Sequence, residues 1–368
     1  MKNKEMIKKI VFTILIFVLG ITTSVLVIYK YPNILKITTT KLIKSVTVTD
    51  NGISSAVSKV YDKVIVVNTY KNNQKYSSGS GFVYKKDGKN TYIITNNHVV
   101  ANSDSYKVTY TDGKEVKATL VGSDEYSDIA VLKVESREGY DEVELGNSNN
   151  LKPGDTTFVV GAPLNNEYSW TVTRGIISGK ERLVEISTTK QGSSDYVISV
   201  LQTDAAVNSG NSGGPLCNAN GEVIGVVSAK ISGTGVEGMG FAIPIETAKE
   251  KADQIINGKN TTYPYLGISM MNLSNLKNYP NYYNYLQNTK RENGVVVIDV
   301  ENNSSAKKAG LGQGNIITKI DNKETNNVAY LRYELYKHKV GDTITITYER
   351  DGKEKTVKVK LTSNGEKM

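Results

Sequence analysis

The chain has 368 residues, of which 39% are hydrophobic, and carries a formal net charge of +8 at pH 7. Its length exceeds one typical domain and predicts two folded domains with a sizeable core. The lysines are scattered through a sequence that is also rich in Asn, Ile and Tyr, without the clustered basic face of a nucleic-acid-binding protein, so no nucleic-acid partner is expected. Cys217 is the only cysteine, which excludes an intrachain disulfide and indicates a small buried residue.

Residues 10–29, IVFTILIFVLGITTSVLVIY, are uncharged. At about 1.5 Å per residue this run covers a hydrocarbon core of about 30 Å. The run is longer than a signal-peptide core and lacks an A-x-A cleavage site, so we expect an uncleaved membrane anchor; a signal peptide is the alternative. Lysines lie on both sides of this run, so the positive-inside rule predicts its orientation only weakly, with a slight preference for residues 1–9 in the cytoplasm. Residues 30–50, rich in Thr and Lys, are expected to be a linker.

Residues 51–258 are expected to form the first folded domain. A short helical pattern begins near Ile53, and many short strands at hairpin-like spacing follow, which predict an all-β barrel or sandwich. The predicted strands are residues 64–70, 79–84, 91–96, 106–110, 129–134, 156–163, 171–179, 196–203, 222–229 and 239–244. A helix that opens at Pro244 and stops at Gly258 closes this domain.

Residues 259–368 are expected to form a second domain. Strands mixed with two short helices in about 100 residues predict a small α+β module. A Tyr- and Asn-rich insert lies near residues 271–293.

Ser212 lies in the glycine-rich segment Gly210-Asn211-Ser212-Gly213-Gly214. This segment fits G-x-S-x-G, the nucleophile elbow of α/β-hydrolases, which requires a helix directly after the serine. Here Pro215 and a turn lead into a strand instead. The elbow fold also needs a histidine downstream of the serine, which leaves only His338, at the end of a helix in the second domain. The elbow interpretation therefore fails.

A chymotrypsin-like site requires the chain order His, Asp, Ser, because an imidazole must take the serine proton and a carboxylate must orient that imidazole. His98 lies at the predicted end of the strand TYIITNNHVV, and Asp128 opens the strand DIAVLKV. Asp124 and Glu125 are nearby carboxylates that compete for the same role. The order His98, Asp128, Ser212 fits a serine protease.

The stretches TNNHVV, SDIAVLKV and GNSGGPL resemble the His, Asp and Ser motifs of the HtrA (Deg) serine proteases, in the family's order. SGSGFVY, TVTRGIISG and GMGFAIP are similar to further stretches of the same protease domain. The resemblance implies a chymotrypsin-like double β-barrel followed by a PDZ domain, assembled as a homotrimer. It also implies a catalytic triad of His98, Asp128 and Ser212, with no metal and no cofactor.

Oxyanion stabilisation requires backbone N–H donors, and backbone approaches substrate closely only where side chains are absent. We therefore expect an oxyanion hole built from the Gly210 and Ser212 amides, with Asn211 shaping the turn between them. In the HtrA family this loop is reported to switch between competent and incompetent forms. By resemblance, Val207, Ile231 and Met239 line the S1 pocket and imply a small aliphatic P1 residue.

Tyr265-Leu266-Gly267-Ile268 resembles the carboxylate-binding loop of PDZ domains, where successive N–H groups hold a terminal carboxylate. The ligand implied is an exposed hydrophobic C-terminus of an unfolded or mis-assembled protein. The expected function is thus a membrane-anchored serine endopeptidase acting in protein quality control outside the cytoplasm. Two alternatives stay open: a dedicated protease that cleaves one membrane-bound signalling protein, and a chaperone or peptide-binding scaffold without turnover.

Overall fold

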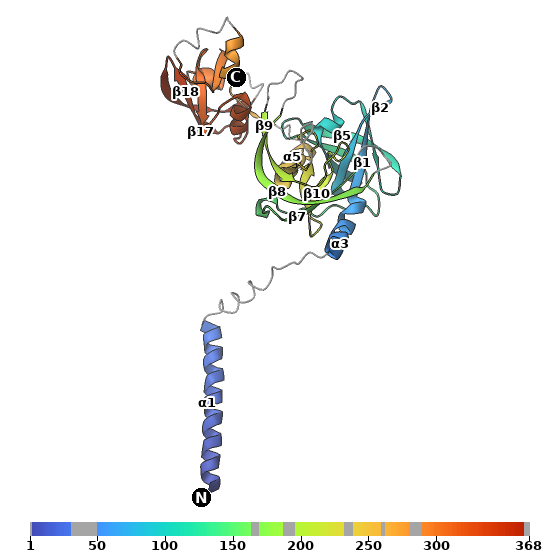
Figure 1. The fold of residues 1–368 in the computed structure, drawn as a ribbon, viewed down its shortest axis with the longest axis vertical. Coiled ribbons are helices and arrows are strands. Elements are labelled where there is room, and N and C mark those ends of the chain that lie inside the picture. The colour runs from blue at the N-terminus through green and yellow to red at the C-terminus, as the bar shows by residue number, and fades with distance from the viewer. Residues whose placement is uncertain are drawn as a thin grey trace. The chain divides into compact units, whose positions relative to one another are not determined.

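The protein is described here from a computed structural model (Figure 1). The structure describes residues 2–30, 50–162, 169–186, 196–231, 238–258, 262–279 and 289–363. The chain divides into two compact units, Met1–Thr49 and Asp50–Met368, and each is described by itself.

The first unit contains one long helix, α1 (Lys2–Lys30). Within it, Lys4–Val27 is a 24-residue segment of mean hydropathy 2.7 that is not buried against other parts of the protein. At about 1.5 Å per residue the segment is long enough to cross a bilayer core of about 30 Å. A signal sequence passes the same test of length and composition. All but the ends of the predicted 30–50 linker lies outside the described residues.

The second unit begins with α3 (Asp50–Val60), a short 3₁₀ turn η1 (Tyr61–Lys63) and a closed antiparallel barrel of six strands. The strands pair in the order β1-β2-β3-β6-β5-β4. Their bounds are β1 (Val64–Lys71), β2 (Gln74–Asp87), β3 (Asn90–Thr95), β4 (Ser105–Thr109), β5 (Glu115–Asp124) and β6 (Ile129–Glu135). The interior is filled by β-branched and aliphatic side chains such as Ile65, Ile93 and Leu132, because alternate residues of each strand point inward.

A second six-stranded closed barrel follows, with strand order β10-β11-β12-β9-β8-β7. Its strands are β7 (Thr156–Gly161), β8 (Thr171–Ile186), β9 (Tyr196–Thr203), β10 (Pro215–Asn218), β11 (Val223–Val227) and β12 (Gly240–Pro244). A shared apolar cluster joins the two barrels, with Phe82 and Ile94 of the first packed in the same core as Phe158 and Ile243 of the second. Chain segments that pass from one barrel to the other are therefore packed against apolar side chains of both barrels.

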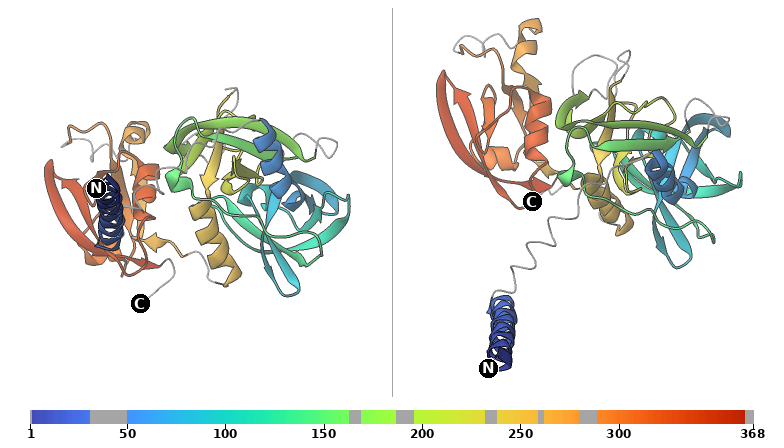
Figure 2. Two further views of the ribbon diagram at one scale, coloured as in Figure 1. Left: turned by 90° about the horizontal axis from the view of Figure 1, so that it is seen from below. Right: turned by 60° about the horizontal axis from the view of Figure 1, so that its bottom comes forward.

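Helix α5 (Ile245–Ile256) follows the second barrel directly, with Pro244 at its N-cap, and is the gold helix of Figure 2. Its apolar face, Ile245, Ala248, Ala252 and Ile255, packs into the cluster that joins the barrels. The helix ends before Gly258, which adopts a φ of +67°, a conformation that glycine enters without steric cost. Start and end agree with the sequence prediction to within one or two residues.

The C-terminal domain has a six-stranded antiparallel sheet, five of whose strands follow the order β14-β15-β16-β18-β19, drawn in orange and red in Figures 1 and 2. The strands are β14 (Ile268–Asn272), β15 (Val295–Val300), β16 (Ile316–Ile320), β18 (Thr343–Arg350) and β19 (Lys353–Lys360). The short strands β13 (Pro264–Tyr265) and β20 (Thr362–Ser363) pair with each other, and β17 (Lys323–Glu324) pairs with β16. The helical elements are η4 (Leu273–Asn278), α6 (Ser305–Lys308) and α7 (Val328–Leu335). Much of the predicted 271–293 insert lies outside the described residues.

The fold class predicted from sequence is confirmed: two chymotrypsin-like barrels and a PDZ domain follow an apolar N-terminal helix. All ten predicted strands of the first domain are present. Two strands were missed: β5, where Glu115 and Lys117 obscure the alternation, and β10, which is four residues long and begins with a proline.

Candidate active site

His98 lies on α4 (Asn97–Val100), a single helical turn directly after β3. The expectation that it ends a strand was wrong by three residues, because β3 stops at Thr95. The strand stops there because the next polar groups bond elsewhere: the Asn96 side chain and the Asn97 N–H both donate to the carbonyl of Asp128, at 2.9 and 3.1 Å. These two bonds bring the histidine and aspartate segments together.

Asp128 occupies the turn between β5 and β6, and its carboxylate is buried against His98. The imidazole Nδ1 lies 2.7 Å from Oδ2 and 3.0 Å from Oδ1, and the His98 backbone N–H donates to Oδ1 at 2.9 Å. The Ser228 hydroxyl donates to Oδ2 at 3.0 Å. A carboxylate placed at Nδ1 favours the tautomer with hydrogen on that nitrogen, which leaves Nε2 free to accept a proton.

Asp124, one of the two competing carboxylates, bonds to residues other than His98. Its Oδ2 accepts hydrogen bonds from the Ser127 N–H at 2.9 Å, the Ser127 hydroxyl at 2.5 Å and the Tyr263 hydroxyl at 2.6 Å. The structure therefore selects Asp128 as the carboxylate beside His98.

Ser212 is only 4% exposed and lies close to the same segment that touches Asp128. Its Oγ accepts a hydrogen bond from the Ala229 N–H at 3.0 Å, and Ala229 follows Ser228, the partner of Asp128. No hydrogen bond joins Ser212 Oγ to His98 within the described residues. Such bonds are often long in the absence of substrate, so the geometry agrees with a triad at rest.

Two peptide groups in the loop around Ser212 are hydrogen-bonded through both the carbonyl and the N–H. The peptide between Gly210 and Asn211 is bonded at both ends: its carbonyl accepts from Ser80 Oγ at 2.7 Å, and its N–H donates to Asn208 O at 3.0 Å. The peptide after Ser212 is bonded likewise, to Ser80 N at 2.8 Å and Val227 O at 2.8 Å. The Asn211–Ser212 peptide between them accepts at its carbonyl from the Gly214 N–H at 2.9 Å. Its Ser212 N–H, and the Gly210 N–H that precedes the first of these peptides, donate to no described residue, which leaves both available for a ligand oxygen.

Two of these glycines are required by conformation. Gly210 and Gly213 have φ values of +100° and +86°, where other residues are strained. A Cβ atom on Gly213 would also collide with the Ser80 carbonyl and Thr95 Oγ1.

The predicted S1 residues are partly brought together. Val207 packs in the core of the second barrel, and its Cγ2 would lie 2.7 Å from a Cβ placed on Gly240. Met239 is adjacent to Gly240 and is 39% exposed, as expected for a side chain in an open pocket. Ile231 is buried in the cluster that joins the barrels. Residues 232–237 lie outside the described residues, and the S1 assignment stays a prediction.

The predicted carboxylate-binding loop lies between β13 and β14. Gly267 has a φ of +74°, and the carbonyls of Leu266 and Gly267 accept from Ala306 N at 3.0 Å and Glu301 N at 2.9 Å. A cavity of about 460 Å³ is lined by this loop and by Leu331 and Leu335 of α7. A groove between a β-strand edge and a helix is the form in which PDZ domains add a peptide strand.

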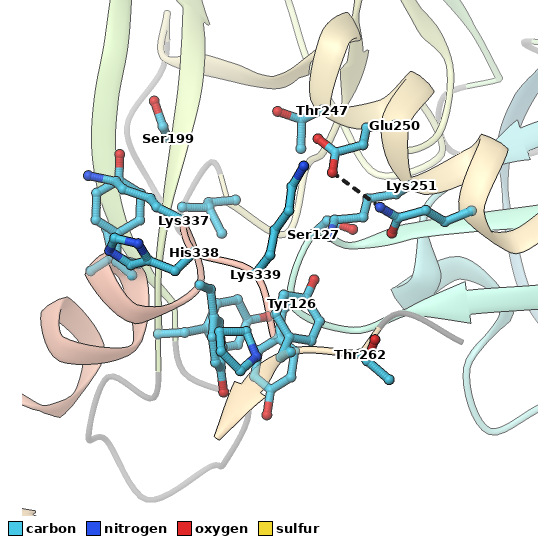
Figure 3. Close-up of a pocket in the computed structure, with 18 of the residues that line it drawn as sticks. Tyr126, Ser127, Ser199, Thr247, Glu250, Lys251, Thr262, Lys337, His338 and Lys339 are labelled. Carbon is cyan, nitrogen blue, oxygen red and sulfur yellow. Dashed lines mark hydrogen bonds between the residues drawn. The ribbon is translucent and has the colours of Figure 1, made fainter. Parts of the chain in front are cut away.

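A larger cavity of about 790 Å³, shown in Figure 3, contains none of the three triad candidates. Tyr126, Ser127 and Lys251 lie on one side of it, and Lys337 and His338 on the other. Because neither His98 nor Ser212 lines this cavity, we place the candidate chemistry at the triad candidates and not here. No group of three or more His, Cys, Asp or Glu suited to a metal ion occurs among the described residues.

Sequence reasoning missed Ser80, Asn96 and Ser228, which hold the candidate triad in place. All three are fully buried or nearly so. A polar residue at a position where strand alternation predicts a buried apolar one is the signal that would have identified them.

Comparison with known families agrees with this architecture. The trypsin-like peptidase domain family matches residues 79–226, and the PDZ domain family matches residues 264–361. The chain is 40% identical over 295 residues to the serine protease Do-like HtrA of Lactobacillus helveticus, covering 79% of this chain and 70% of that protein. It is 43% identical to the Do-like HtrA of Bacillus subtilis, covering 79% of this chain and 64% of the relative.

A relative from Lactococcus lactis subsp. cremoris is matched over 89% of this chain and 87% of its own length, at 36% identity. Among solved structures, the HtrA-type protease AlgW with a decapeptide superposes with a TM-score of 0.64 at 30% identity, covering 85% of this chain and 98% of that one. With its trypsin-like peptidase and PDZ domains, the chain is a serine endopeptidase that belongs to the HtrA (Do-like) family.

Proposed function

We propose that Ser212 is the nucleophile, His98 the general base and Asp128 the residue that orients the imidazole. In this reaction Ser212 Oγ attacks the scissile carbonyl while His98 Nε2 takes its proton, and the imidazolium then protonates the leaving amine. The Gly210 and Ser212 N–H groups stabilise the tetrahedral oxyanion. The observation that carries this proposal is the buried contact of His98 Nδ1 with Asp128 Oδ2 at 2.7 Å, next to the Ser228-Ala229 segment that touches Ser212.

We further propose that the substrates are unfolded or mis-assembled proteins outside the cytoplasm. The groove between the 265–268 loop and α7 supports recognition of a hydrophobic C-terminus that regulates cleavage, because Leu266, Leu331 and Leu335 give it an apolar lining. A related HtrA-type protease has been solved with a decapeptide.

The membrane topology is part of the same proposal. The exposed apolar segment Lys4–Val27 supports an uncleaved anchor, with the N-terminus in the cytoplasm and both folded domains on the other side. Assembly as a homotrimer is proposed from the family alone.

A dedicated regulatory protease, which cleaves one membrane-bound protein, is the second candidate. The single apolar helix favours it, since an anchored protease meets membrane substrates at high effective concentration.

The experiment is cleavage of unfolded casein by the full-length protein in detergent micelles, with Ser212→Ala as the paired variant and with or without peptides that end in hydrophobic residues. We expect turnover to fall by about 10⁶-fold in the variant and to rise with peptide in the wild type. Equal activity in both proteins rejects Ser212 as the nucleophile. Suppression of casein aggregation without cleavage supports a chaperone instead, and cleavage restricted to a single membrane protein supports the dedicated protease.

A further inference from the structure

Ser80, on strand β2 of the first barrel, has all of its polar groups bonded to segments that surround the candidate active site. Its N–H donates to Ser212 O at 2.8 Å and its hydroxyl donates to Gly210 O at 2.7 Å. The same hydroxyl accepts from the Ala162 N–H at 3.0 Å, and its carbonyl accepts from Thr95 Oγ1 at 2.7 Å.

These partners come from both barrels. Gly210, Ser212 and Ala162 belong to the second barrel, whereas Thr95 ends the strand that leads to His98. A buried serine whose polar groups only needed hydrogen-bond partners would bond within its own strand or to an adjacent turn. Ser80 instead joins the histidine side of the cleft to the serine side.

The Ser80 segment packs against the Ser212 loop so closely that neither Gly79 nor Gly213 has room for a side chain. Glycine at position 213 is required because any Cβ there would collide with the Ser80 carbonyl, and a Cβ on Gly79 would lie 3.0 Å from Ser212 O. Ser80 is fully buried, so its hydrogen bonds are not in competition with water.

The two carbonyls that Ser80 holds, those of Gly210 and Ser212, lie next to the two free amides in the chain. Fixing the carbonyl of Gly210 fixes one peptide plane, and fixing the carbonyl of Ser212 fixes the plane two peptides further on. The Ser212 N–H lies between these planes, and the Gly210 N–H immediately precedes the first. The plane that carries the Ser212 N–H is also held at the Asn211 carbonyl, which accepts from the Gly214 N–H at 2.9 Å. Ser80 adds to this by holding the planes on both sides of the Ser212 N–H and the plane that follows the Gly210 N–H.

We propose that Ser80 is a positioning residue for the oxyanion hole: it sets the orientation of the Gly210 and Ser212 N–H groups without touching substrate. This inference rests on the proposed roles of Ser212 and of those two amides. Its hydroxyl links the loop to Ala162, at the end of β7, so the hole is held simultaneously by both barrels.

The test uses full-length protein in detergent micelles and a short peptide amide with valine at P1. Ser80→Ala removes the hydroxyl with a minimal change of volume. We expect kcat, per active site titrated with a fluorophosphonate, to fall by roughly 10- to 100-fold while KM is unchanged, because misplaced donors weaken the transition state and not substrate binding. Ser80→Cys, which keeps a weak donor, is expected to recover part of the loss.

The inhibition constant of a peptide boronic acid is a measurement that a purely structural role of Ser80 would not change. Its tetrahedral adduct with Ser212 places an oxygen where the oxyanion forms, so its Ki should rise in Ser80→Ala by the same factor as kcat/KM falls. The matched control is Ser148→Ala, which removes another buried hydroxyl, one that donates to Glu246 away from the cleft. We expect wild-type kcat per site and Ki for this control.

If Ser80→Ala has the kcat per site and the boronic acid Ki of the wild type, the inference is overturned. This holds even if the fluorophosphonate labels a smaller fraction of the molecules. If Ser80→Ala does not fold, the same comparison is made with Ser80→Cys, where wild-type values again overturn it. Wild-type cleavage that survives Ser212→Ala instead rejects the proposed function, so the two failures are distinguishable.

Discussion

At the scale of single residues, the backbone of Asp128 is unusual. Its φ of +56° lies in the left-handed region, which few residues other than glycine, asparagine and aspartate adopt. Strained conformations of this kind persist where surrounding contacts determine them, and here the contacts are those to Asn96, Asn97 and His98. The strained turn aims the carboxylate at the imidazole.

Asp128→Asn tests this role without disturbing the backbone, because asparagine also tolerates a positive φ. Its amide would face Nδ1 and favour the wrong imidazole tautomer, so we expect kcat to fall by about 10⁴-fold with little loss of stability. The measurement is hydrolysis of a short peptide amide, together with thermal unfolding. Asp104→Asn is the control, since Asp104 is an exposed carboxylate that accepts a backbone N–H from Asn72. Full activity in Asp128→Asn would remove Asp128 from the triad.

At the scale of elements, β2 contributes to the site and to the closing helix. Ser80 lies in its first half, and four residues later Tyr84 donates its hydroxyl to Asp253 Oδ1 of α5 at 2.8 Å. Burial, and then the hydrogen bond to Asp253, raise the pKa of Tyr84 well above its ordinary value. Helix α5 is thus joined to the first barrel by a partly buried polar contact as well as by its apolar face.

Tyr84→Phe removes only this hydroxyl. We expect the free energy of unfolding to fall by about 1 kcal/mol, because the partly exposed Asp253 carboxylate loses a donor, while activity is unchanged. Urea denaturation measures it as a lower midpoint at constant slope. Tyr61→Phe, at a more exposed tyrosine, serves as the reference and should leave the midpoint unchanged. A midpoint equal to that of the wild type would show that the Tyr84 contact contributes nothing.

At the scale of the whole molecule, buried tyrosines make stability depend on alkaline pH. Burial raises the pKa of Tyr110 to about 12, and it also raises the pKa values of Tyr84, Tyr263 and Tyr336 above the ordinary 10.0. Above pH 10 the unfolded chain has lost protons that the folded chain still binds. The stability that these tyrosines contribute is therefore fully present below pH 10. It is lost as the pH rises from 10 through their pKa values in the folded state.

We expect the melting temperature to be level near pH 8–9 and to fall between pH 10 and 12. Over that range the free energy of unfolding should fall by about 1.4 kcal/mol per pH unit for each tyrosine still protonated in the fold. Thermal unfolding at a series of pH values measures this. In Tyr110→Phe the slope should be smaller by the contribution of one group. A melting temperature that stays level to pH 12, or an unchanged slope in the variant, contradicts the expectation.

The sequence by itself determined the class of the two domains and the family. Period-two strand patterns, the proline and glycine that bound α5, and three motifs in a fixed order are local properties, so they can be read without the fold. They also identified His98, Asp128 and Ser212 as candidates. They did not determine where β3 ends, because that depends on bonds from Asn96 and Asn97 to a carbonyl some 30 residues away in the chain.

Only the tertiary structure showed Asp128 against the imidazole, with Asp124, the last residue of β5, bonded to Ser127 and Tyr263 instead. It also revealed Ser80 and Ser228, whose importance lies in partners 130 and 100 residues away along the chain. The physical reason is that a hydrogen bond depends on distance and direction in space, whereas sequence patterns record only which side of an element faces the core.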